Sequence, residues 1–114
     1  MPMTTAAARE VLVLTVQGQT LDRSNTARFK QELAGHLRPG IKIALDLSQV
    51  HCVDGSGCGA VLSVHKQAAS LGGEMMVCSL HKPVRALFQK LGLHRRVPMY
   101  NRTDEAVQSL WDRR

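Results

Sequence analysis

The sequence predicts an α/β domain in which a mixed β-sheet of four to five strands packs against about four α-helices. Short apolar runs rich in β-branched residues alternate with segments whose apolar residues recur every three or four positions. Gly and Pro residues separate these segments. A chain of 114 residues can bury one core but not two. We therefore predict one domain over residues 1–114, with residues 1–9 flexible.

The first half of the chain predicts two strands with a helix between them. Residues 11–16 form an apolar, β-branched run that is typical of a strand buried on both faces. Ser24 or Asn25 can then cap a helix whose apolar positions recur every fourth residue until Pro39. Residues 41–47 place large apolar side chains at every second position, which predicts a strand.

The second half predicts three helices and one further strand. Apolar residues within 58–69 have helical spacing, and residues 74–80 have the composition of a strand. The segment 83–91 begins with Pro, which suits a first helical turn, and is followed by a terminating Gly. We expect a short extended piece near Val97 and a last helix capped by Thr103.

The turn Asp54-Gly55-Ser56-Gly57 directly precedes the predicted helix over 58–69. The first N–H groups of a helix lack partners and the helix dipole is positive there, so a phosphate on Ser56 could be stabilised by these amides. Such a group would add a charge of about −1.5 to −2 beside Asp54. The two glycines leave the Ser56 hydroxyl unobstructed. For these four residues alone, a plain helix cap is the more frequent explanation, because Ser is a preferred N-cap and Asp-Gly a common turn.

Several short segments follow one another in a characteristic order along nearly the whole chain. They are Leu21-Asp22 after Gly18, Leu45-Asp46-Leu47-Ser48-Gln49-Val50, Val53-Asp54-Gly55-Ser56-Gly57, Leu71-Gly72-Gly73-Glu74, Val84-Arg85-Ala86-Leu87-Phe88 and Leu91-Gly92-Leu93. In this order and spacing the chain resembles the STAS domain family, named for sulfate transporters and anti-sigma factor antagonists. The resemblance implies a single STAS-like domain.

The resemblance further implies an anti-sigma factor antagonist that works by partner switching and catalyses nothing itself. The unmodified protein would bind an anti-sigma factor that is also an ATP-dependent serine kinase, and would thereby free a sigma factor for transcription. Phosphorylation of Ser56 by that kinase would end the binding, and a metal-dependent serine phosphatase would restore it. The residues expected to bind the partner are Asp22, Asp54, Gly55, Ser56, Gly57 and Cys58.

The chain departs from the family pattern at three places. Where the family usually has Asp-Ser-Ser-Gly or Asp-Ser-Thr-Gly, this chain has Gly55 in place of the first Ser. Cys58 stands where the family usually has Leu, and one additional residue lies between Gly18 and Asp22. The phosphate acceptor, Ser56, is kept.

The charge distribution leaves an alternative from another functional class open. Of the net charge of +6, most lies in residues 82–114, which carry eight Lys or Arg against three Asp or Glu. A basic segment suits proximity to anionic lipid. The chain could therefore be an unphosphorylated STAS subunit of a lipid-transport ABC system, or part of a multiprotein signalling scaffold.

The remaining composition argues against other functions. There is one Trp, one Tyr and two Phe and no interleaving of basic with aromatic residues, so we expect no direct nucleic-acid binding. No phosphate-binding glycine loop or paired carboxylates support nucleotide hydrolysis, and we expect no enzyme activity and no cofactor. No apolar run approaches the length of about 20 residues that spans a bilayer. With no secretory leader in the sequence, we expect a cytoplasmic protein without stable membrane insertion.

The thiols and imidazoles form no metal-binding or disulfide pattern. Five His are scattered among different predicted elements, and three Cys include no Cys-x-x-Cys pair. Cys58 could be a redox sensor at a helix N-terminus, but its place on an apolar stripe favours a buried, inert thiol. Cys52 with a nearby His as a catalytic pair is a weaker hypothesis, because nothing fixes the His as a base.

Overall fold

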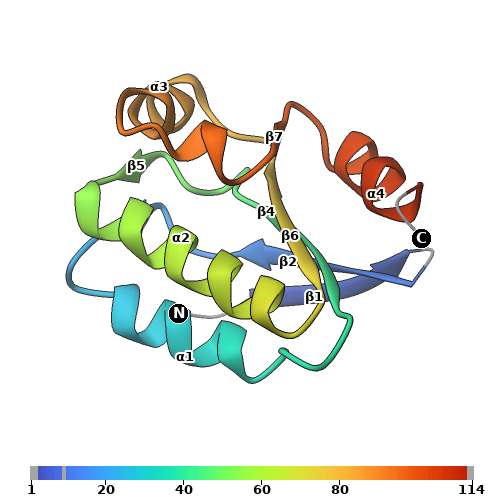
Figure 1. The fold of residues 1–114 in the computed structure, drawn as a ribbon. Helices are drawn as coiled ribbons and strands as arrows, with labels where there is room; N and C mark the ends of the chain where they lie inside the picture. Colours follow the sequence, from blue (N-terminus) through green and yellow to red (C-terminus); the bar gives the residue numbers. More distant parts are fainter. Residues whose placement is uncertain (1–2, 9, 113–114) are drawn as a thin grey trace.

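A five-stranded mixed sheet with the order β1-β2-β4-β6-β7 forms the centre of the protein (Figure 1). The computed structural model describes residues 3–8 and 10–112. The strands are β1 (Met3–Ala8), β2 (Val11–Val16), β4 (Lys42–Asp46), β6 (Glu74–Cys78) and β7 (Met99–Tyr100). β1 pairs with β2 in antiparallel fashion, and the other neighbours are parallel. The predicted mixed sheet of four to five strands is confirmed.

The described residues include four α-helices, as the sequence predicts. They are α1 (Thr26–Ala34), α2 (Gly55–Ser70), α3 (Lys82–Lys90) and α4 (Thr103–Trp111), and a short 3₁₀ helix, η1 (Leu93–Arg95), follows α3. α1 and α2 lie together over one face of the sheet (Figure 1). α4 packs on β2, β4, β6 and β7 from the opposite face.

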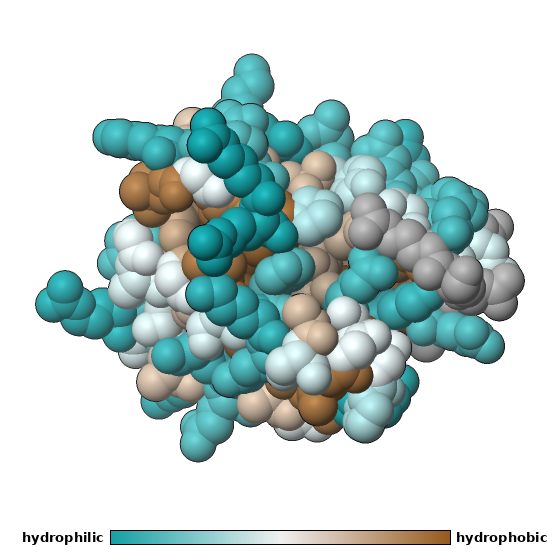
Figure 2. All heavy atoms as spheres, in the orientation of Figure 1, coloured by the Kyte–Doolittle hydropathy of each residue, from teal (hydrophilic) through white to brown (hydrophobic). Residues whose placement is uncertain are grey.

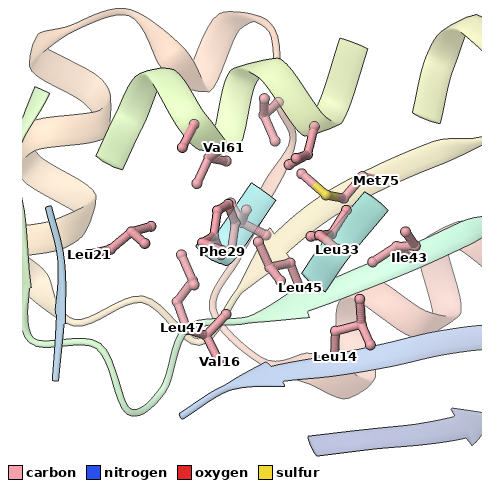
Figure 3. Packing of buried hydrophobic residues seen from close by; sticks show 14 of the residues in the cluster. Leu14, Val16, Leu21, Phe29, Leu33, Ile43, Leu45, Leu47, Val61 and Met75 are labelled. Carbon is pink, nitrogen blue, oxygen red and sulfur yellow. The ribbon is translucent and has the colours of Figure 1, made fainter. Parts of the chain in front are cut away.

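The side chains that alternate along the strands build two cores, one on each face of the sheet. The larger core contains Leu14, Leu45 and Met75 from the strands, with α1 and α2 above them. Figure 3 shows Phe29 and Leu33 of α1 reaching toward β4 in this core. The smaller core joins the other sheet face to α4; its buried residues are Val11, Ala44, Met76, Cys78, Ala106, Val107 and Leu110.

A second sheet, which the sequence did not predict, consists of β3 (Thr20–Leu21) and β5 (Cys52–Val53). The two strands are parallel, and Leu21 is the register partner of Val53. This small sheet fixes the chain just before α2 against the chain just before α1. It therefore decides where the Asp54-Gly55-Ser56-Gly57 segment lies.

The structure corrects several sequence-based boundaries. Within the segment expected to be flexible, residues 3–8 form β1, while residues 1, 2 and 9 lie outside the described part. α1 ends at Ala34 rather than near Pro39, because residues 35–36 and 39–40 form turns. The strand predicted over 74–80 ends at Cys78, where Ser79 adopts a positive φ of 61°.

The last two predicted elements are each displaced by one or two residues. The extended piece expected near Val97 is β7, and Val97 itself is buried before it. The N-cap of α4 is Arg102 rather than Thr103, which is the first helical residue. Among the described residues, no helix combines the length and the apolar character needed to cross a membrane.

Candidate functional site

The segment from Asp54 to Cys58 lies at the start of α2, which begins at Gly55 and so earlier than the sequence predicted. Asp54 is the N-cap, with extended backbone and a carboxylate that accepts a hydrogen bond of 2.9 Å from the Gly57 amide. The residue of this motif that caps the helix is therefore Asp54 and not Ser56. Ser56 instead lies within the first turn, where its side chain is exposed.

Ser56 and Asp54 are joined by their side chains. The Ser56 hydroxyl donates a hydrogen bond to Asp54 Oδ1 over 2.6 Å, and the Gly57 amide donates to the same oxygen. The Ser56 hydroxyl, followed by the Gly57 amide, lowers the pKa of Asp54 below its ordinary value. Asp54 is thus held as a carboxylate directly beside the exposed hydroxyl.

A backbone amide at this helix end already binds Asp54. The Gly57 amide donates to its carboxylate, and the amides of Ser56 and Arg23 also favour its ionised form. The sequence led us to expect that these amides would stabilise a phosphate on Ser56. In the structure the Gly57 amide already donates to Asp54, so a phosphate on Ser56 would compete with that carboxylate for it, and stabilisation of the phosphate by the amides stays a prediction.

The β3–β5 pairing brings Asp22 to the same edge as Asp54, since each Asp directly follows one residue of the Leu21–Val53 pair. The Asp54 amide donates to the Leu21 carbonyl over 3.3 Å. The Asp22 carboxylate accepts hydrogen bonds from the amide and hydroxyl of Ser24, at 2.9 and 2.5 Å. Asp22 therefore shapes the turn before α1, and the two carboxylates lie on neighbouring segments despite the additional residue after Gly18.

The two glycines beside Ser56 differ in their packing. A Cβ on Gly57 would clash with the Leu21 carbonyl oxygen and lie 2.8 Å from Val53 Cγ1, so a side chain there would disturb the β3–β5 contact. A Cβ on Gly55 would meet no atom within 4 Å. The Cβ of the Ser that the family usually has at position 55 would therefore meet no steric obstacle.

Cys58 is buried, as the sequence predicts, with only 4% of its surface exposed. Burial, with a further contribution from the Asp54 charge, raises the pKa of its thiol to about 11. The thiol is therefore protonated at neutral pH and is no redox sensor of the low-pKa kind. Of the residues expected to bind a partner, Gly57 and Cys58 are both buried and offer little surface.

Sequence reasoning missed a groove that opens beside this site. It has a volume of about 400 Å³ and is lined by Gly55, Cys58, Gly59, Leu62, Leu91, Gly92, Leu93 and Arg96. Its two walls, α2 and the α3–η1 segment, are about 30 residues apart in the chain, so no local motif marks it. In the described part of the chain, no three His, Cys, Asp or Glu side chains are placed to hold a metal ion.

Comparison with known proteins supports the resemblance found in the sequence. The sequence model of the STAS domain matches residues 3–106. The chain belongs to the STAS domain family. It is 33% identical to the anti-sigma F factor antagonist of Paenibacillus polymyxa over 90% of this chain and 88% of that protein. Within the STAS family, the chain is thus similar to the anti-sigma factor antagonist type.

Two solved STAS proteins illustrate the shared fold. An anti-sigma-factor antagonist domain protein from Planctomyces limnophilus has a TM-score of 0.84 and 16% identity, covering 95% of this STAS domain and 97% of that chain. The unphosphorylated form of the anti-sigma factor antagonist SpoIIAA has a TM-score of 0.72 and 20% identity, covering 95% of each chain. The phosphorylated form of SpoIIAA, from Bacillus, has a TM-score of 0.64 at 20% identity, covering 95% of this chain and 98% of that one.

Proposed function

We propose that this STAS domain is a cytoplasmic anti-sigma factor antagonist that switches partners through phosphorylation of Ser56. The observation that carries the proposal is the exposed Ser56 hydroxyl at the start of α2, hydrogen-bonded over 2.6 Å to Asp54. The similarity to an anti-sigma F factor antagonist over 90% of the chain supports it. SpoIIAA, which shares the fold, exists in unphosphorylated and phosphorylated forms.

In the proposed cycle the unmodified protein binds an anti-sigma factor that is also a serine kinase, and a sigma factor is released. The kinase then transfers the γ-phosphoryl group of ATP to Ser56. The bond between this phosphorus and the leaving ADP oxygen breaks, a bond to Ser56 Oγ forms, and the hydroxyl proton passes to a general base of the kinase. A metal-dependent phosphatase later hydrolyses the phosphoester and regenerates the hydroxyl.

The local geometry explains why this modification would change the surface. The hydrogen bond to Asp54 requires the hydroxyl proton, which a phosphoserine no longer has. The phosphate would also place about −1.5 to −2 charges beside a carboxylate that is already ionised. Phosphorylation thus replaces an attraction between the two side chains by a repulsion, and a partner docked on this surface would be released.

Phosphorylation assays test the proposal directly. The wild-type protein is incubated with Mg-ATP and each anti-sigma factor serine kinase encoded in the source genome, and the intact mass is measured. We expect one phosphate on the wild type and none on Ser56→Ala. Ser48→Ala, which changes an exposed serine outside the residues expected to bind the partner, is the matched control and should be labelled normally. Failure of every kinase to label the wild type, or equal labelling of Ser56→Ala, would refute the proposal.

A further inference from the structure

The groove beside the Ser56 site continues along α2 into a second hollow. The second hollow, of about 580 Å³, is lined by Leu62, His65, Lys66, Ala69, Ser70 and Arg96. Leu62 and Arg96 line both hollows. We call the two together the α2–α3 groove. It runs from Gly55 at the first turn of α2 to Ser70 at its last residue.

The α2–α3 groove combines an apolar surface with positive charge. Leu91 is 54% exposed, the most exposed of the large hydrophobic residues described, and Leu62 is half-buried beside it. Arg96 and Lys66 are exposed, and no Asp or Glu lines either hollow. Figure 2 shows hydrophobic surface between α3 and α2, interrupted by long hydrophilic side chains. A ligand for this surface needs apolar side chains and negative charge.

The groove begins at the first turn of α2, which also carries the proposed phosphorylation site. Gly55, which lines its first hollow, is the residue immediately before Ser56. A chain segment that filled the first hollow would therefore contact the residue next to Ser56. Phosphorylation of Ser56 would place negative charge at the helix turn where the groove begins.

We propose that the α2–α3 groove binds an acidic, amphipathic segment of the anti-sigma factor kinase, an inference that rests on the function proposed above. Apolar side chains of this segment would pack on Leu62 and Leu91. Its carboxylates would pair with Arg96, whose guanidinium can hold a carboxylate with two hydrogen bonds, and with Lys66. A phosphate on Ser56 repels these carboxylates, which links groove binding to the phosphorylation state.

Binding measurements on charge-reversal variants test this inference. The probe is the kinase that labels Ser56 in the assay above, titrated in the presence of ADP so that no phosphate is transferred. Arg96→Glu and Leu91→Ser should each weaken binding about tenfold. Lys30→Glu reverses an exposed charge on α1, and Leu71→Ser removes the other exposed large hydrophobic residue; both should bind as the wild type does. Thermal unfolding of each variant shows whether it is folded.

The possible results separate this inference from the proposed function. If the kinase labels Ser56 but binds Arg96→Glu, Leu91→Ser and the wild type equally, the groove inference is wrong and the proposed function stands. If no kinase labels or binds the wild type, both are wrong. Another possible occupant of the groove is a second copy of this chain, which would insert the exposed acidic residues of its α4. If the protein forms a concentration-dependent dimer that Arg96→Glu abolishes, while the affinity for the kinase is unchanged, the inference is overturned.

Discussion

The Ser56 hydroxyl donates a 2.6 Å hydrogen bond to the carboxylate of Asp54, the residue that caps α2. The same carboxylate oxygen accepts the Gly57 amide, so one oxygen atom serves both the proposed phosphate acceptor and the helix end. A modification of Ser56 therefore acts on the capping of α2 as well as on the surface charge. This relationship motivates the first of the following predictions.

Replacing Asp54 should separate its capping role from its charge. Asn is as good an N-cap as Asp, whereas Ala removes the cap, so we expect Asp54→Ala to unfold at a lower temperature than Asp54→Asn at pH 7. The pKa of Asp54 is lower in the folded state than in the unfolded state, where it is about 4. Ionised Asp54 therefore stabilises the fold above about pH 4, and this stabilisation is lost as the pH falls through the pKa of the folded state. The wild type should thus lose stability relative to Asp54→Asn below about pH 4. A difference in unfolding temperature between the wild type and Asp54→Asn that stays constant down to pH 2 would contradict this prediction.

Substitution by alanine at two glycines of α2 should change the free energy of unfolding in opposite directions. Gly57→Ala places a Cβ against the Leu21 carbonyl oxygen and should cost about 1–3 kcal/mol in free energy of unfolding. Gly59→Ala meets no atom within 4 Å and should stabilise the helix by about 0.5–1 kcal/mol. Urea denaturation of the two variants measures both effects. If both variants changed the free energy of unfolding equally and with the same sign, the β3–β5 contact would not constrain Gly57.

The three thiols should react with a disulfide reagent at very different rates. Cys52 is exposed, whereas Cys58 and Cys78 are buried and burial raises the pKa of each thiol to about 11. At pH 8 we expect one thiol per molecule to react rapidly with the reagent in the native protein and three in denaturant, because only an accessible thiolate reacts. The Cys52→Ser variant should lose the fast phase. Two or more fast equivalents in the folded wild type would show that α2 or α4 packs less tightly than described.

Both ends of α4 are held by charged side chains of β4. Lys42 Nζ donates to the Leu110 carbonyl near the end of the helix over 3.1 Å, and Thr103 at its start donates to Asp46 over 3.3 Å. Each charge complements the helix dipole at its end. Lys42→Met should lower the free energy of unfolding by about 1 kcal/mol. Lys30→Met, on the exposed side of α1, is the matched control and should change it by less than about 0.5 kcal/mol.

The sequence predicted those features of the fold that depend on local periodicity. The apolar run of 11–16, the alternating strand before Asp46 and the stripes of α2 and α3 are each visible within one segment. β3 and β5 were missed because two-residue strands exist only through their pairing with each other. β1 was missed because its Thr and Ala residues show no apolar alternation, and its pairing with β2 makes it a strand.

The candidate site was predictable in part for the same reason. Ser56 and Asp54 lie two residues apart at a helix start, where the motif alone favours a plain cap, and the order of segments along the whole chain was needed to select Ser56. The hydrogen bond from the Gly57 amide to Asp54 depends on the position at which α2 begins. The helix begins earlier than the sequence predicted. The α2–α3 groove depends on how α3 and η1 pack against α2, which no single segment encodes.

The most direct test of the account compares the kinase affinity of this STAS domain before and after stoichiometric phosphorylation of Ser56. Calorimetric titration with the kinase and ADP should give a measurable affinity for the unmodified protein. For the phosphorylated protein we predict an affinity at least about tenfold weaker, because the phosphate removes the hydrogen bond to Asp54 and adds repulsion beside it. Equal affinities of the two forms would contradict the proposal that Ser56 is the switch.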